Sequence, residues 1–195
     1  MYDYEKYYKQ YKLIAGIDEV GRGALAGPVV SACVILPLGC TLPVNDSKKL
    51  SPKKRKLLFD EIKKIAIATE VGIVDNDIID KINILQATKL SMEISLKNIS
   101  LKPNLLLIDA LAINTKIPQK AIVNGDGLVA PIAAASIIAK VTRDEIMVNM
   151  HNYYPQYGFD KHKGYGTKLH IQSIKDNGMC KIHRYTFKNS SHKVR

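Results

Sequence analysis

Cysteine is scarce in this sequence. The 195 residues include only Cys33, Cys40 and Cys180, with no Cys-x-x-Cys pair. Disulfide-rich secreted domains and structural zinc sites need more cysteines at closer spacing. We therefore expect reduced, partly buried thiols in a cytoplasmic protein.

Long hydrophobic segments are also absent. Residues 1–6 are too polar for a secretory signal. The longest weakly polar stretch, 127–139, ends at Lys140 and is shorter than the roughly 20 residues of a membrane span. A Gly-x-x-x-x-Gly-Lys-Ser/Thr loop is missing too, which argues against a phosphotransferase that uses a small nucleotide. We expect no membrane partner.

Acidic residues are outnumbered by basic ones. There are 18 Asp and Glu against 29 Lys and Arg, which gives a net charge of +11. This excess favours a polyanionic partner such as nucleic acid. A Lys-rich composition alone would give the same charge, and a non-catalytic nucleic-acid-binding module would share it.

Length and composition favour one domain. The chain is 46% apolar and 24% charged, and a chain of this size buries enough surface to fold without disulfides. We expect an α/β core over about 12–150, a helical C-terminal part over about 151–187 and a flexible polar tail over 188–195. We expect a monomer.

Apolar runs alternate with helical patterns along the chain. Ser51 and Pro52 are typical of a helix start, Asn83 of a helix cap and Gly178 of a helix end. Alternating strands and helices indicate an α/β fold with a mixed sheet. The predicted strands are 12–17, 29–36, 69–74, 104–108 and 120–123, and the predicted helices are 52–65, 83–99, 131–150 and 165–177. Tyr4, Tyr7, Tyr8 and Tyr11 predict a short helix docked on the domain.

Four carboxylates stand at the ends of predicted elements. Asp18 and Glu19 follow the first strand, Asp109 follows an apolar run, and Asp126 lies in an Asn-Gly-Asp-Gly turn. Functional groups of α/β sheets gather at strand ends. Oxygen ligands favour Mg²⁺ or Mn²⁺ over Zn²⁺, and two such ions can clamp a phosphodiester during its displacement. We therefore expect a site for two divalent ions.

Two of these acids carry alternative interpretations. Neighbouring strand residues point to opposite faces. Asp18 and Glu19 converge only if the strand bulges or ends there, or if Glu19 bends round or binds through its main chain. Asp126 alone would be an ordinary turn or cap residue.

Several polar groups are candidates for substrate contact. Gly21, Arg22 and Gly23 follow the acid pair, where glycines let the backbone approach another molecule. Ser47 and Lys48 precede a helix start and are expected to hold phosphate.

A second group lies on the predicted helix 131–150. Ser136 and Lys140 share a helix face, extended by Arg143 and Asp144. They are expected to contact the nucleic-acid backbone or to form a polar helix edge, with Asp144 free to pair with an arginine.

The histidines do not have zinc spacing. We expect His162 and His170 to position their segment or touch phosphate. His183 and Arg184 are expected to be structural or to contact phosphate.

Taken together, the motifs closely resemble those of the bacterial ribonuclease HII family. The resemblance covers about residues 12–187, in family order. One departure is small: Thr186 stands where the family often has serine. The related type III enzymes lack arginine in the glycine loop and carry an extra N-terminal domain, so type II is preferred. The matching segments are 16–23, 46–51, 108–110, 125–126, 133–144, 162–170 and 183–184.

The resemblance implies a ribonuclease H-like fold and a metal-dependent endonuclease. It implies hydrolysis of RNA in RNA–DNA hybrids and cutting 5′ of ribonucleotides in duplex DNA, with 3′-OH and 5′-phosphate ends, in ribonucleotide excision repair and DNA replication. It assigns the metal site to Asp18, Glu19, Asp109 and Asp126. It assigns sensing of the ribose 2′-OH to Gly21, Arg22 and Gly23, and packing at the ribo–deoxyribo junction to Tyr165.

Overall fold

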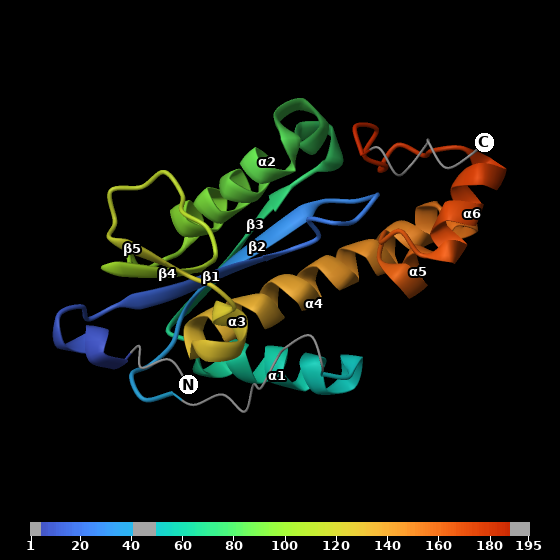
Figure 1. Cartoon of the computed structure of the whole chain (residues 1–195). Helices are drawn as coiled ribbons and strands as arrows, with labels where there is room; N and C mark the ends of the chain where they lie inside the picture. Colours follow the sequence, from blue (N-terminus) through green and yellow to red (C-terminus); the bar gives the residue numbers. More distant parts are fainter. Residues whose placement is uncertain (1–4, 41–49, 188–195) are drawn as a thin grey trace.

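A mixed five-stranded sheet forms the centre of the molecule (Figure 1). This computed structural model describes residues 5–40 and 50–187. The strand order is β3-β2-β1-β4-β5; β2 is antiparallel to both neighbours, whereas β1, β4 and β5 run parallel. The strands are β1 (Ile14–Val20), β2 (Val29–Ile35), β3 (Ala68–Val74), β4 (Leu105–Asp109) and β5 (Gln119–Ile122).

Helices cover both faces of the sheet. α4 and α1 lie on one face and α2 on the other, while α5 and α6 lie beyond the far end of α4 (Figure 1). The predicted α/β class, with a helical C-terminal part, is confirmed. The helices are α1 (Pro52–Ile65), α2 (Asn76–Asn98), α3 (Gly125–Leu128), α4 (Ala130–Tyr153), α5 (Phe159–His162) and α6 (Lys168–Asn177), with 3₁₀ turns at Glu5–Lys9 and Pro155–Tyr157.

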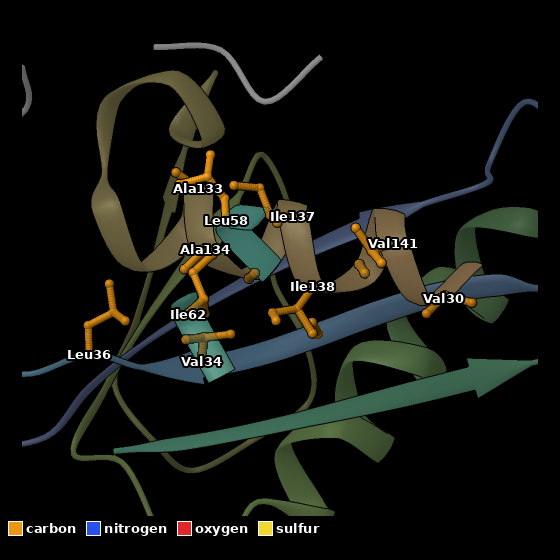
Figure 2. Packing of buried hydrophobic residues seen from close by; sticks show 13 residues of the cluster. Val30, Val34, Leu36, Leu58, Ile62, Ala133, Ala134, Ile137, Ile138 and Val141 are labelled. Atoms are coloured by element: carbon orange, nitrogen blue, oxygen red, sulfur yellow. The ribbon is translucent and has the colours of Figure 1, made fainter. Parts of the chain in front are cut away.

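Strand β2 divides its side chains between the two layers. Val30 and Val34 belong to one buried cluster with residues of α1 and α4, in which Val34 lies near Ile62 and Val30 near Val141 (Figure 2). The alternate residues, such as Cys33, pack on the α2 side. This period-two alternation buries both faces of the strand, so β2 is apolar throughout.

Helix α4 rests directly on the central strand at Gly16. A Cβ atom at Gly16 would lie 2.0 Å from the Pro131 carbonyl carbon. Only glycine allows the helix backbone to come this close. The contact fixes how deeply α4 sits, and it brings Ser136 of this helix to the end of β1.

Two helix starts show what the capping residues do. The Ser51 side chain accepts a hydrogen bond from the Lys54 N–H, and α1 begins at Pro52 as predicted. Asn83 adopts a positive φ of 65° inside α2, and its Oδ1 accepts from the N–H groups of Leu85 and Gln86. Asn83 therefore caps a helix that continues to Asn98, as predicted. A shorter helical segment, which begins at Asn76 and was not predicted, precedes it across a kink.

The prediction of a helix from Tyr165 was wrong at its start. Helix α6 begins at Lys168, where the Thr167 side chain accepts from the His170 N–H. Tyr165 instead lies in a loop and forms a β-bridge with Ala24. Gly178 follows the helix with φ of +74°, as the predicted stop.

The N-terminal tyrosines dock as expected, although on a 3₁₀ turn. Tyr7 and Tyr11 pack against the cluster that includes Ile14 and Leu105. Tyr4 and the side chain of Tyr8 lie outside the described part of the chain, as does the predicted tail 188–195.

The structure also describes the three cysteines and the apolar character of the helices. Cys33 is buried, Cys40 and Cys180 are half-buried, and all three thiols are free. Within residues 5–40 and 50–187, no helix has the length and apolar character needed to cross a membrane.

Candidate metal centre and substrate loop

Asp18 and Asp109 lie side by side just beyond the point where the pairing of strands β1 and β4 ends. The pairing of β1 with β4 runs to Ile17 and Ile108, so the two aspartates follow at matching positions. Asp18 shares its face of β1 with Gly16, toward α4. There the Asp18 carboxylate is hydrogen-bonded to the Ser136 side chain of α4, and only 4% of Asp18 is exposed.

Glu19 continues the strand in regular pairing. The register of β1 with β2 is unbroken from Asp18 through Val20. A bulge or a strand end at Glu19 was therefore the wrong expectation. Glu19 Oε1 lies 3.2 Å from Arg22 Nη1 in an ion pair, so the carboxylate is held at the start of the glycine loop.

Asp126 comes to the same edge through α3. Asn124, with φ of 55°, turns the chain, and the Gly125 N–H donates to Asp109 Oδ1 over 2.9 Å. Asp126 is the next residue and is 7% exposed. The turn therefore serves to anchor this segment on Asp109.

Mutual repulsion and burial raise the pKa values of two of the acids. Burial raises the pKa of Asp18 well above its ordinary value, and the charges of Glu19 and Asp109 raise it further, against a hydrogen bond from Ser136. Burial also raises the pKa of Glu19. The hydrogen bond and the positive charge of Arg22 lower this pKa, whereas the negative charge of Asp109 raises it further. Asp109 therefore acts on both neighbours, and the ionised acids destabilise one another.

The acids fit a site for a hard divalent cation. Glu19 Oε2 is buried and has no hydrogen-bond partner among the described residues, which is costly for a charged oxygen. The donors are all oxygens, which suit Mg²⁺ or Mn²⁺. Among residues 5–40 and 50–187, no group of three or more His, Cys, Asp or Glu side chains is placed so that it could hold a metal ion, so an ion bound by two of these acids would need other ligands as well.

The glycines of the adjacent loop differ in their surroundings. A Cβ atom on Gly21, whose φ is +96°, would lie 2.2 Å from Arg143 Nε. A Cβ on Gly23 would meet nothing within 4 Å. Gly21 therefore makes room for a buried side chain, and only Gly23 leaves space for an approaching molecule.

Tyr165 and Lys140 lie together beyond this loop. Lys140 Nζ is 5.8 Å from the centre of the Tyr165 ring and bonds Asp144 Oδ1 at 2.7 Å. Asp144 also lies 3.9 Å from Arg55 Nη1, so the expected pairing with an arginine is confirmed. Ser47 and Lys48 lie outside the described residues.

Arg143 does not reach solvent, so its predicted backbone contact was wrong. It is fully buried, and its guanidinium donates to the carbonyls of Ala26, Pro28 and Lys163. Arg184 is equally buried and donates to the carbonyls of Arg22 and Gly27. A role in holding the loop was not predicted for either arginine.

His162, His170 and His183 form a buried network instead of contacting phosphate. His170 and His183 face each other with their Nε2 atoms 3.1 Å apart, and the His170 Nδ1 donates to the Tyr165 carbonyl. His162 accepts from the Gly164 N–H. Their predicted positioning role is confirmed.

Comparison with known proteins agrees with this geometry. The family model described as Ribonuclease HII matches residues 15–190. The chain is 57% identical over 175 residues to a ribonuclease HII of Bacillus cytotoxicus, covering 89% of this chain and 68% of that protein. It is 51% identical to a ribonuclease HII of Syntrophus aciditrophicus, and the match covers 98% of this chain and 92% of that protein.

A solved structure agrees as well. The ribonuclease H2 of Pyrococcus horikoshii OT3 superposes with a TM-score of 0.76 at 25% identity, covering 91% of this chain and 95% of the other. With the family model matched over most of the sequence, the chain belongs to the ribonuclease HII family.

Proposed function

We propose that Asp18, Glu19, Asp109 and Asp126 form the hydrolytic centre of this ribonuclease. The protein hydrolyses the RNA strand of RNA–DNA hybrids and cuts 5′ of ribonucleotides embedded in duplex DNA. The observation that carries the assignment is the mutual repulsion of Asp18, Glu19 and Asp109, with one buried Glu19 oxygen that no described group satisfies.

These acids would hold the cations that the chemistry needs. When bound, two Mg²⁺ or Mn²⁺ ions would supply a hydroxide nucleophile and stabilise the departing 3′ oxygen. Asp18 and Asp109 provide adjacent oxygens on one face of the sheet. Ser136 and the Gly125 N–H orient these two carboxylates through hydrogen bonds, so both are in place before substrate arrives.

The loop and the aromatic ring next to it read the sugar. The ribose 2′-OH is the group that separates RNA from DNA at one site. The open space at Gly23 lets main-chain groups of Gly21, Arg22 and Gly23 approach this hydroxyl. Tyr165 offers a flat face to the neighbouring deoxyribose.

Positive charge around the centre attracts the duplex. Lys140 projects beside Tyr165, and Ser136, Ser47 and Lys48 are proposed to add phosphate contacts. The net charge of +11 strengthens this attraction. We place the enzyme in the cytoplasm as a monomer that serves ribonucleotide excision repair and DNA replication.

A cleavage assay on three matched duplexes tests this proposal. One contains a single ribonucleotide, one is all DNA and one has a full RNA strand. With Mg²⁺ or Mn²⁺, the expected result is a cut 5′ of the single ribonucleotide, cutting within the RNA strand and an intact DNA duplex. Excess chelator should abolish all cutting.

The main alternative is a non-catalytic nucleic-acid-binding module. Such a module would bind equally with or without chelator and leave all three duplexes intact. Buried carboxylates beside the binding surface argue against it, because they repel phosphate unless cations neutralise them. Cutting that persists in chelator would instead refute the role of metal.

A further inference from the structure

The loop between β1 and β2, residues 21–28, is hydrogen-bonded to the C-terminal part of the chain at several points. Ala24 bridges to Tyr165, and the Leu25 N–H donates to the Gly164 carbonyl over 2.8 Å. The Gly27 N–H donates to the Ile182 carbonyl, also over 2.8 Å. Residues far apart in sequence therefore form one continuous surface next to the acids.

Two buried arginines lie beneath this surface. Arg143 and Arg184 are each 0% exposed. Together they donate six hydrogen bonds, all to main-chain carbonyls. Arginine is almost never fully buried unless it is well paired, and here the backbone of the loop supplies most of that pairing.

Each arginine links main-chain carbonyls of different residues. Arg184 spans the carbonyl of Arg22, at the start of the loop, and that of Gly27, near its end. Arg143 joins the Ala26 and Pro28 carbonyls to that of Lys163.

Arg143 also contacts the aromatic ring. Its guanidinium carbon lies 5.3 Å from the centre of the Tyr165 ring, within cation–π range. One side chain therefore touches both segments that the proposed function assigns to reading the sugar.

The fork geometry of arginine is what allows this bridging. A guanidinium presents several N–H groups in a rigid plane, whereas a lysine ammonium is a single point on a flexible stem. Lysine at position 184 would keep the charge but could not hold the Arg22 and Gly27 carbonyls in one fixed arrangement.

We propose that Arg143 and Arg184 are positioning residues that set the Gly21–Gly23 loop against Tyr165 and thereby determine which phosphodiester is cut. The inference rests on the proposed function, since it assumes that these two segments read the sugar. Neither arginine touches the substrate; both act through the main chain they hold.

The position of the cut tests this directly, because it does not depend on how much protein is folded. The substrate is a DNA duplex with a short run of ribonucleotides in one strand. Wild-type enzyme gives the reference pattern. Arg184→Lys is expected to spread cleavage to neighbouring phosphodiesters and to lower kcat/KM for a single embedded ribonucleotide at least about tenfold.

Two further variants make the comparison decisive. Arg143→Lys should also spread the cuts while leaving the Arg184 contacts in place. Met92→Ala, in the core on the α2 side of the sheet, should lower Tm and keep the wild-type pattern. Circular dichroism confirms that each variant is folded at the assay temperature.

Folded lysine variants with the wild-type pattern and kcat/KM within about twofold would overturn the inference. Failure of both lysine variants to fold, while Met92→Ala folds, would also overturn it, because the arginines would then serve only the stability of the fold. If wild-type enzyme cuts none of the ribonucleotide-containing duplexes, the proposed function fails instead.

Discussion

The acidic edge of the sheet and the arginine pair beneath the loop both bury charge, but in opposite ways. Arg143 and Arg184 each donate three hydrogen bonds to carbonyls. At the acidic edge, like charges lie together and Glu19 Oε2 has no partner among the described residues. A buried charge that the protein satisfies supports the structure, whereas one that it leaves unsatisfied indicates a place for a ligand.

The largest expected effect separates activity from folding at Asp109. In Asp109→Asn, the amide oxygen can still accept from the Gly125 N–H, so Tm should change by only a few degrees. The lost charge should lower kcat by about a thousandfold or more. Steady-state cleavage and thermal unfolding measure the two quantities.

Asp160→Asn provides the matched control, since Asp160 pairs with His151 away from the acidic edge. It should keep kcat within about twofold. An Asp109→Asn enzyme that retains wild-type kcat would refute the role of this carboxylate.

The next effect contrasts two glycines of one loop. Gly21→Ala places a methyl group against Arg143 in a backbone with φ of +96°, so it should cost about 2–4 kcal/mol of unfolding free energy. Gly23→Ala enters open space and should cost less than about 1 kcal/mol while raising KM. Urea unfolding and kinetics distinguish them; equal destabilisation would contradict the contrast.

Removing charge from the acidic edge should stabilise the protein. The pKa of Asp18 is raised in the folded state, so stability falls as pH rises from the ordinary aspartate pKa through the folded value. Above that pH range, the free energy of unfolding of Asp18→Asn should exceed that of wild type by about 1 kcal/mol. This gain should appear as a higher Tm in the absence of metal.

Mg²⁺ or Mn²⁺ should likewise raise the Tm of the wild type, and by less in Asp18→Asn. This measurement tests metal binding without any assay of activity. A variant that is less stable than wild type at pH 8 without metal would argue against repulsion at this edge.

The smallest effect concerns the histidine network. Burial lowers the pKa of His170 to about 4, and the pKa values of His162 and His183 are also lowered, mainly by burial. For a histidine with a depressed folded pKa, stability is complete above the unfolded value of about 6.5 and declines as pH falls toward the folded one. Tm should therefore fall between about pH 6.5 and 4, and less steeply in His170→Gln. Parallel slopes in the two proteins would rule out this contribution.

The acidic edge was predictable from sequence because its signals are local. A carboxylate after an apolar run correctly indicated the end of β4 at Asp109, whereas β1 continues past Asp18 to Val20. The parallel pairing of β1 with β4 brings Asp18 and Asp109 to one edge. The Thr167 cap could also have corrected the start of α6, since threonine favours that position.

The arginine pair could not be found in the same way. Arginine is usually exposed, and Arg143 lies on a helix whose polar edge suggested solvent. Its burial depends on carbonyls of residues 26–28, more than a hundred positions earlier. The helical segment from Asn76 was missed because Asn83 correctly marks the start of the helix that follows the kink, and the prediction began there.

The Arg184 contacts also bear on the order in which the enzyme matures during synthesis. The hydrogen bonds from Arg184 to the Arg22 and Gly27 carbonyls join residues that lie 162 and 157 positions apart in the sequence. During synthesis, strands β1, β2 and β4, which include Asp18, Glu19 and Asp109, leave the ribosome before residue 184 does. The loop contacts of Arg184 can therefore form only after the strands that carry Asp18, Glu19 and Asp109 have been synthesised.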